Sequence, residues 1–359
     1  MSVDAAVSKI KSTKVTHRNW EEAINSAFYK LTYSEPGDVI CITGPSRAGK
    51  TRLIGELARL LGGGLGDDES GIMRCVTVDA ENTGPHGKFS TKAFTLKMLK
   101  AVRHPIYGGI GDDLNQDYSR SKAERATEGT LRSALESAFL NRKSRFLFID
   151  EAQHVRYTSK DAMGAYAVLD SWKCMAKASG ITLVIVGAYP ILEVIGKSPH
   201  LIGRKSQIHL PRYQDNAEDF QQFRRILQFY ANLIGEAAEE GVLIELEDML
   251  YDGSLGCIGL LQQWLIRAAA QSCAKGFRIS RASLEHEMLS EADLVSIAQE
   301  IRLGESILKL PDYKYVKDLN GDPGGNPKNP RKVKARKSKP FQRNPKRFKP
   351  GNRTDPDAD

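Results

Sequence analysis

A glycine-rich segment near the start of the chain has the residue types and spacing of a phosphate-binding loop. The segment Gly44–Thr51 fits the pattern G-x-x-x-x-G-K-[ST], with an apolar run before it and a helical pattern over residues 51–61 after it. Backbone N–H groups and the first turn of such a helix can face phosphate oxygens without intervening Cβ atoms. The residues that we expect to bind the nucleotide are Gly44, Pro45, Ser46, Arg47, Ala48, Gly49, Lys50, Thr51 and Arg52. Among them, Lys50 would reach the β- and γ-phosphates of ATP, and Thr51 would ligate Mg²⁺.

Two adjacent acids later in the chain could supply the second half of such a site. Asp150 and Glu151 follow the apolar run Phe146–Ile149, which predicts a buried strand. At the end of that strand Asp150 can hold Mg²⁺ directly or through water, and Glu151 can orient and polarise an attacking water molecule. An ordinary acidic strand end is the alternative. Together with the phosphate-binding loop, the acidic pair favours hydrolysis of ATP.

A basic turn could supply a residue that senses the γ-phosphate. Gly203, Arg204 and Lys205 come just before the last predicted strand. An arginine at this place could project into the nucleotide site of a neighbouring subunit and stabilise charge there during the reaction. A solvated basic turn is the alternative.

The elements that must position these residues are those of a parallel sheet. Between residues 38 and 210, short β-branched apolar runs alternate with longer helical segments, which is typical of an α/β fold with helices flanking a parallel sheet. A short amphipathic helix over residues 19–31 precedes the first strand. The predicted strands span residues 39–43, 74–78, 146–149, 182–186 and 206–210.

After residue 211 the pattern becomes helical. Apolar residues recur every three or four positions between 220 and 234, and further helices are predicted near residues 260–274 and 280–302. This periodicity predicts a small all-α domain. The expected parts are an N-terminal helical extension at 1–35, a nucleotide-binding α/β domain at 36–212, a helical lid domain at 213–310 and a disordered basic tail at 311–359.

The excess positive charge of the chain lies in the tail. The formal net charge is +8, whereas the residues from Lys328 onward hold 12 Lys or Arg and 3 Asp. The rest of the chain is therefore nearly neutral. A composition rich in Gly, Pro, Asn and Lys predicts disorder for the tail. Its basic residues, with Phe341 and Phe348 among them, could bind DNA nonspecifically or dock on a partner protein, and a solubilising end is the alternative.

Cysteine usage and hydropathy indicate a cytoplasmic protein. The five cysteines form no CxxC pair and no zinc-ligand spacing, so we expect reduced, mostly buried thiols. The N-terminus lacks the apolar core of a signal peptide. No stretch approaches the ~18 uninterrupted apolar residues that span a membrane, so we expect no membrane partner.

Basic side chains recur between the second and third predicted strands. At near-helical spacing they could contact successive phosphates of duplex DNA, which gives affinity without base readout. The alternative is the solvated face of an amphipathic helix whose Phe94, Leu96 and Leu99 pack inward. The residues that we expect to bind DNA are Lys88, Thr91, Lys92, Lys97, Lys100 and Arg103.

The motifs together resemble a known family, the TniB/TnsC transposition ATPases. These are AAA+ regulators related in role to MuB, and some work in CRISPR-associated transposons. The resemblance covers roughly residues 15–270. The elements that carry it are the P-loop, the box Phe-Ile-Asp150-Glu151-Ala-Gln153, the strand ending in Val-Gly187-Ala188, and Gly203-Arg204.

The resemblance implies an AAA+ fold and ATP-dependent homo-oligomers, as a ring or helical filament, around duplex DNA. It further implies that the oligomer marks a target site and recruits the transposase, with a target-selection protein as another partner and hydrolysis driving disassembly. By motif position it implies that Lys50 and Thr51 bind phosphate and magnesium and that Asp150 holds the metal. In the same way Glu151 would be the catalytic base and Arg204 the arginine that acts in trans.

The sequence departs from the usual AAA+ pattern at two places. Ala188 stands where many AAA+ proteins have a polar sensor after the fourth strand. The helical domain reads Gly256-Cys-Ile-Gly259 without an arginine directly after it, which leaves Arg267 as the nearest candidate for a second sensor. Both departures predict slow hydrolysis, which suits a timer better than a motor.

Two other classes of function stay open at this point. A signalling or scaffold NTPase that acts on protein partners only would share the nucleotide motifs. A small-molecule kinase would need an acceptor other than water. Stimulation of ATPase activity by duplex DNA separates the first from a DNA-bound regulator, and phosphate release without an acceptor argues against the second.

Overall fold

The computed structural model describes most of the chain up to residue 309. The described ranges are 3–62, 71–82, 87–108, 121–158, 162–196 and 205–309. Residues up to 310 belong to one compact unit. The basic tail at 311–359 lies outside the described ranges, so its disorder stays a prediction.

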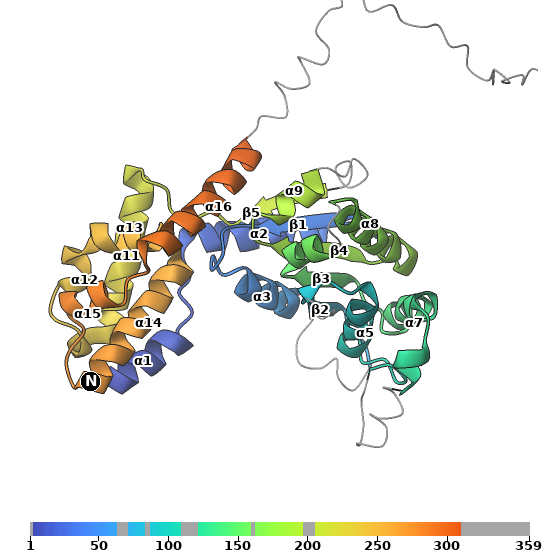
Figure 1. Ribbon diagram of the computed structural model, residues 1–359, viewed down its shortest axis with the longest axis horizontal. Coiled ribbons are helices and arrows are strands. Elements are labelled where there is room, and N and C mark those ends of the chain that lie inside the picture. The colour runs from blue at the N-terminus through green and yellow to red at the C-terminus, as the bar shows by residue number, and fades with distance from the viewer. Residues whose placement is uncertain are drawn as a thin grey trace, which may run out of the picture. The chain divides into compact units, whose positions relative to one another are not determined.

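Five parallel strands form the sheet of the α/β part (Figure 1). Their lateral order is β2-β3-β4-β1-β5, so β4 separates β1 from β3. Each strand begins and ends within one residue of its predicted bounds, and the predicted parallel α/β fold is confirmed. The strands are β1 (Val39–Thr43), β2 (Cys75–Asp79), β3 (Phe146–Asp150), β4 (Thr182–Gly187) and β5 (Lys205–His209).

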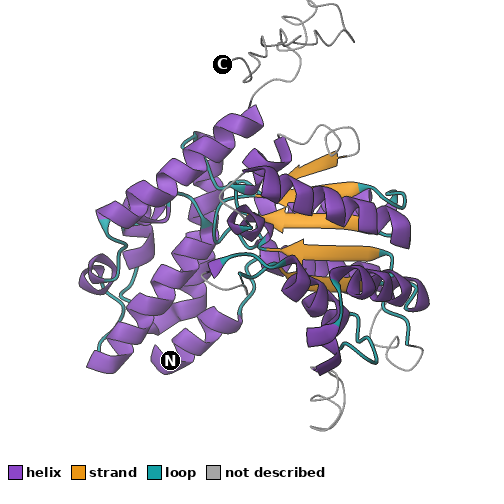
Figure 2. Cartoon of the chain, turned by 45° about the vertical axis from the view of Figure 1, so that its right-hand side comes forward, coloured by secondary structure: helices purple, strands orange, loops and turns teal. Residues whose placement is uncertain are grey.

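Alternating strand residues supply two cores on opposite faces of the sheet. Val39 and Cys41 of β1 pack on one face with α5, α7 and α8, whereas Ile40 and Ile42 pack on the other face with α2 and α3. Figure 2 shows the strands lying between these helices. The helices of this part are α2 (Arg18–Thr32), α3 (Lys50–Gly62), α5 (Thr91–Ala101), α7 (Glu128–Asn141), α8 (Ala162–Ser179) and α9 (Ile191–Gly196), with the 3₁₀ helix η2 (Ala152–Tyr157) after β3.

The rest of the described chain is helical. Ala6 and Ile10 of the N-terminal helix α1 belong to the core of this part, whereas α2 covers the sheet. None of the helices in the described ranges is long and apolar enough to cross a membrane. The helical part contains α1 (Val3–Ser12), α11 (Ala217–Ile234), η3 (Gly235–Ala237), α12 (Val242–Glu245), α13 (Glu247–Ser254), α14 (Ile258–Lys275), α15 (Arg281–His286) and α16 (Glu291–Lys309).

The single helix predicted near residues 280–302 was wrong, because the structure has two helices there. Ser280 caps α15 by accepting a hydrogen bond from the backbone N–H of Ser283. Ser290 then accepts a hydrogen bond from the backbone N–H of Asp293 at 3.2 Å, at the start of α16. A serine that bonds to the backbone two or three residues ahead competes with continuous helix, so the chain restarts at residue 291.

α16 returns from the helical part to the carboxyl edge of the sheet (Figure 1). Its Ile301 is buried with Tyr189, which follows β4, and with Cys257 before α14. Gly304 lies so close to the Tyr189 ring that an added Cβ would be 2.0 Å from Tyr189 Cγ. The last described helix therefore packs directly beside the strand ends.

Candidate nucleotide-binding site

The predicted phosphate-binding loop connects β1 to α3 in a tight turn. Gly44 approaches the chain after β5 so closely that an added Cβ would be 2.4 Å from the carbonyl oxygen of Leu210. The backbone N–H of Ala48 donates to the carbonyl of Pro45 at 3.2 Å, and Gly49 has a φ of +93°. The two glycines of the motif thus suit the path of the backbone as well as phosphate chemistry.

Lys50 is a buried cation at the start of α3. It is only 7% exposed, and its Nζ donates to the carbonyl oxygens of Gly44 at 3.2 Å and Pro45 at 2.8 Å. Burial lowers the pKa of Lys50, while three nearby carboxylates, that of Glu151 foremost, act in the opposite direction. Two backbone carbonyl oxygens of the loop therefore accept hydrogen bonds from the Lys50 ammonium group, which we expect to bind phosphate oxygens.

Thr51 and Asp150 form a hydrogen bond, although β4 lies between the strands that precede them. Thr51 Oγ1 donates to Asp150 Oδ2 at 2.7 Å, and Asp150 is 1% exposed at the last position of β3. Mg²⁺ in nucleotide sites takes one or two protein oxygens and completes its shell with phosphate oxygens and water. A threonine hydroxyl and a carboxylate at hydrogen-bond distance fit that requirement.

Glu151 leaves β3 in a left-handed backbone conformation. Its φ is 53°, a conformation that a side chain with Cβ rarely adopts and that is often found at functional sites. The backbone N–H of Glu151 donates to Asp150 Oδ1 at 2.8 Å, and its carboxylate lies 3.9 Å from His154 Nε2. The side chain is half-exposed, in contrast to that of Asp150.

Gln153 links Glu151 to the end of β4, a contact that sequence reasoning missed. Its Nε2 donates to Glu151 Oε2, and its Oε1 accepts a hydrogen bond from the backbone N–H of Ala188 at 3.1 Å. Gln153 is part of the Asp-Glu-Ala-Gln box in the sequence. The amide two residues after the acidic pair was the available signal, but no local pattern indicates its partner, the backbone of Ala188 just after β4.

The helical part approaches the loop from the other side. Gly259, in the first turn of α14, lies so close that an added Cβ would be 1.9 Å from the carbonyl oxygen of Arg47. Ser46 Oγ donates to Glu300 Oε1 of α16 at 3.4 Å. The predicted second sensor, Arg267, instead donates to the carbonyl of Glu287 at 3.0 Å. Among the described residues, the Glu300 carboxylate thus contacts the loop, while Arg267 is engaged with Glu287.

Arg52 contacts protein groups next to the loop. Its guanidinium stacks over the ring of Trp20 at 4.6 Å, and its Nη1 donates to the carbonyl oxygen of Val15 at 2.6 Å. These contacts tie α3 to α2 and to the segment before α2. Arg52 therefore has a structural role, whereas its contact with nucleotide stays a prediction.

Three of the predicted DNA-binding side chains are already engaged within the chain. Thr91 donates to Glu128, and Lys97 pairs with Glu81 at 2.7 Å. Lys92 donates to a backbone carbonyl oxygen at 2.9 Å. Their hydrogen-bonding groups would have to exchange partners to reach phosphate.

The other predicted DNA-binding residues lie at the two ends of α5. Lys88 and Lys100 are exposed, and Arg103 follows the helix with a φ of 52°. Phe94 and Leu99 of α5 are buried, as the amphipathic pattern predicts. Arg204 lies outside the described residues, so its role in trans stays a prediction.

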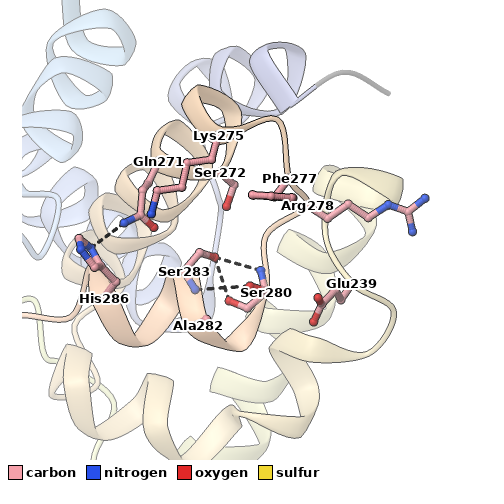
Figure 3. Close-up of a pocket in the computed structure, with 10 residues that line it drawn as sticks. All are labelled: Glu239, Gln271, Ser272, Lys275, Phe277, Arg278, Ser280, Ala282, Ser283 and His286. Atoms are coloured by element: carbon pink, nitrogen blue, oxygen red, sulfur yellow. Dashed lines mark hydrogen bonds between the residues drawn. The ribbon is translucent and has the colours of Figure 1, made fainter.

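A cavity of about 600 Å³ lies in the helical part and includes none of the predicted site residues (Figure 3). Lys275, Phe277 and Arg278 line it near the end of α14, and Ser280 and His286 line it from α15 and its cap. The nucleotide motifs and this cavity therefore mark different places in the protein.

Comparisons with known proteins identify the domain. Residues 34–195 match the family described as AAA domain. A search of curated proteins finds no match. A Walker-type ATPase of Pyrococcus abyssi is similar in structure, with a TM-score of 0.50 at 13% identity over 87% of this chain and 82% of that one. Drosophila ORC bound to DNA has a TM-score of 0.50 at 11% identity over 89% of this chain and 82% of that one.

At these identities the two structures show a likeness of fold alone. The matched range contains the loop after β1 and the acidic pair at the end of β3. The parallel sheet, the P-loop and the domain match agree with one another. The protein therefore contains an AAA-type P-loop domain, followed by a helical region.

Proposed function

We propose that this protein is an ATP-dependent, DNA-binding AAA+ regulator of DNA transposition. It hydrolyses ATP with Mg²⁺, oligomerises on duplex DNA, marks a target site and recruits the transposase, and hydrolysis drives disassembly. One observation carries the catalytic part of the proposal. The hydrogen bond from Thr51 to Asp150 joins the two expected metal ligands from β3 and the loop, directly beside Glu151.

Each side chain at this edge of the sheet has a distinct task in hydrolysis. Lys50 pairs with phosphate oxygens, and Thr51 and Asp150 hold Mg²⁺, which neutralises phosphate charge when bound with ATP. Glu151 accepts a proton from the water that attacks the γ-phosphorus. The new P–O bond forms as the bond to the bridging oxygen breaks, and ADP is the leaving group.

The DNA part of the proposal rests on the family resemblance and on the exposed cations around α5. Drosophila ORC, one of the structures similar in fold, is bound to DNA. Lys88 and Lys100 are exposed at opposite ends of α5. An oligomer with Arg204 acting in trans would repeat such cations along the duplex, which suits sequence-independent binding.

One observation favours the rival function, a signalling or scaffold NTPase that acts on proteins only. Thr91 and Lys97, two of the side chains expected to bind DNA, are engaged with the carboxylates of Glu128 and Glu81. Those acids would also repel phosphate. The two functions therefore differ in whether duplex DNA changes the rate of hydrolysis.

Phosphate release tests the proposal, with wild type and Glu151→Gln each assayed with and without duplex DNA. The amide keeps the shape of the carboxylate but cannot accept the proton from water, so kcat should fall by about 100-fold or more. Affinity for ATP should change little because Lys50, Thr51 and Asp150 remain. Glu240→Gln, at an exposed glutamate of the helical part, is the control and should hydrolyse at the wild-type rate.

Duplex DNA should raise phosphate release by the wild type, and Glu151→Gln should stay assembled on DNA after the wild type has dissociated. Hydrolysis that DNA leaves unchanged would favour the signalling or scaffold NTPase. A wild type that binds ATP but releases no phosphate would refute the catalytic assignment. The transposition role is tested separately, by scoring target insertion of an element that carries Glu151→Gln.

A further inference from the structure

We propose that Gln153 is a positioning residue for Glu151 and supplies the polar group that position 188 lacks. This role deepens the proposed hydrolysis of ATP and rests on it. Ala188 is 5% exposed and has no side-chain hydrogen-bonding group. Its backbone N–H, however, donates to Gln153 Oε1 at 3.1 Å. A glutamine from the β3 side thus occupies the place next to β4 where a sensor side chain would be expected.

The two ends of the Gln153 amide face partners that fix its orientation. A backbone N–H can only donate, so Oε1 must face Ala188. An ionised carboxylate can only accept, so Nε2 must face Glu151 Oε2. The amide therefore bridges the ends of the adjacent strands β3 and β4 in one orientation.

Gly187 leaves the space that this amide fills. A Cβ at position 187 would lie 2.7 Å from Gln153 Oε1, closer than real Cβ contacts come. Its next neighbours, Gln153 N and Ile191 Cγ2, would be at 3.4 Å, which is ordinary van der Waals distance. A side chain at 187 would therefore displace the amide while disturbing little else.

Glu151 needs such an anchor more than Asp150 does. Asp150 is buried at the end of β3 and holds the N–H of Glu151. Glu151 has a half-exposed side chain on a backbone of positive φ. A general base contributes only when it lies within hydrogen-bond reach of the water it deprotonates, and supporting contacts set that geometry. The hydrogen bond from Gln153 restricts where the carboxylate can lie.

Steady-state hydrolysis by Gln153→Met tests this role. Methionine keeps the length of the side chain but forms neither hydrogen bond. We expect kcat to fall by about 10-fold to 100-fold, with KM and the affinity for a fluorescent ATP analogue within about 2-fold of wild type. In the background of Glu151→Gln the same change should have no further effect on kcat. Gln271→Met, at an amide of α14 that lines the cavity of Figure 3, is the matched control.

Gly187→Ala tests the same contact from the other side. Its Cβ should displace the Gln153 amide and lower kcat by a similar factor, and it should add nothing in a Gln153→Met background. Melting temperature is measured for every variant. A fall in kcat without a matching loss of ATP affinity or melting temperature supports the positioning role.

Two results would overturn the inference while leaving ATP hydrolysis intact. In the first, the wild type hydrolyses ATP and both Gln153→Met and Gly187→Ala do so at the wild-type rate. In the second, Gln153→Met loses ATP affinity and melting temperature together with kcat, which would make Gln153 a residue of the fold. If the wild type released no phosphate, the proposed hydrolysis of ATP would be refuted, and the positioning role of Gln153 with it.

Discussion

The two sides of the nucleotide site are built differently. On the sheet side, Thr51, Asp150, Glu151 and Gln153 form a continuous chain of hydrogen bonds at the ends of β1, β3 and β4. On the helical side, the described contacts with the loop include the close approach of Gly259 to the backbone of Arg47 and a longer hydrogen bond from Ser46 to Glu300. The sheet side is therefore held together by side-chain hydrogen bonds, and the helical side meets the loop mainly by close backbone packing.

This difference indicates which changes should affect the binding of ATP and which should affect the packing of the helical part on the loop. Buried charge-assisted contacts are costly to lose, because the remaining partner stays buried without its counterpart. A contact made by the close approach of two backbone segments is instead sensitive to any added side-chain volume. The two sides should thus respond to different substitutions, by different amounts and in different measurements.

Lys50→Ala should have the largest effect, on the sheet side. Alanine leaves the phosphate charge uncompensated, so affinity for ATP should fall by at least about 100-fold. Titration of a fluorescent ATP analogue measures it, with Lys275→Ala in the helical part as the control. An affinity near that of the wild type would remove the basis for assigning the loop to phosphate.

Gly259→Ala should have an intermediate effect, on the helical side. The new Cβ would meet the carbonyl oxygen of Arg47 at 1.9 Å, and a backbone atom cannot move aside cheaply. We expect a loss of about 1–3 kcal/mol in the free energy of unfolding, together with weaker ATP binding. Thermal and denaturant melts measure the loss.

The control for this change is Gly55→Ala, in the interior of α3. Apart from its chain neighbours and the backbone of its own helix, no heavy atom lies within 4 Å of the Cβ that it adds. Because alanine is the better helix former, it should stabilise the protein by up to about 1 kcal/mol. Equal effects of the two substitutions would mean that the helical side does not depend on close approach to the loop.

Glu300→Gln should have the smallest effect. Unlike the two substitutions above, it should strengthen the binding of ATP rather than weaken it. The Glu300 carboxylate contacts Ser46 of the loop and adds negative charge near Lys50. Removing that charge should raise affinity for ATP by roughly 3-fold to 10-fold, because phosphate would no longer be repelled. Glu291→Gln, at an exposed position in the first turn of the same helix, is the control. Weaker binding by Glu300→Gln would instead make Glu300 part of the nucleotide site.

Local pattern was enough to predict the strands and the places of Thr51 and Asp150, but not the contact of Gln153 with Ala188. Buried parallel strands consist of nearly continuous apolar runs, so their bounds could be read to within one residue. The loop motif then places Lys50 and Thr51 at the end of one strand, and Asp150 ends another. Since these strands are parallel, their carboxyl ends share one edge, and the contact between Thr51 and Asp150 follows.

The helical side depends on contacts between residues that are far apart in the sequence. The spacing of apolar residues along the chain predicts helices but not such contacts. Glu300 and Ser46 are far apart in the sequence, and no spacing links them. The capping serine at 290 also went unrecognised, so the helix that carries Glu300 was predicted as part of a longer one. For the same reason the inward face of α5 was predictable, whereas the pairing of Lys97 with Glu81 was not.

α16 lies across the ends of three neighbouring strands. Glu300 meets the loop after β1, Gly304 packs on Tyr189 after β4, and Glu305 pairs at 2.9 Å with Arg212 after β5. Residues 287–290 link this helix to α15 along the chain. In mechanical terms α16 is a crossbar, because it spans these strand ends and its Ile301 also packs with Cys257 of the helical part. α16 therefore braces these strand ends against the helical part.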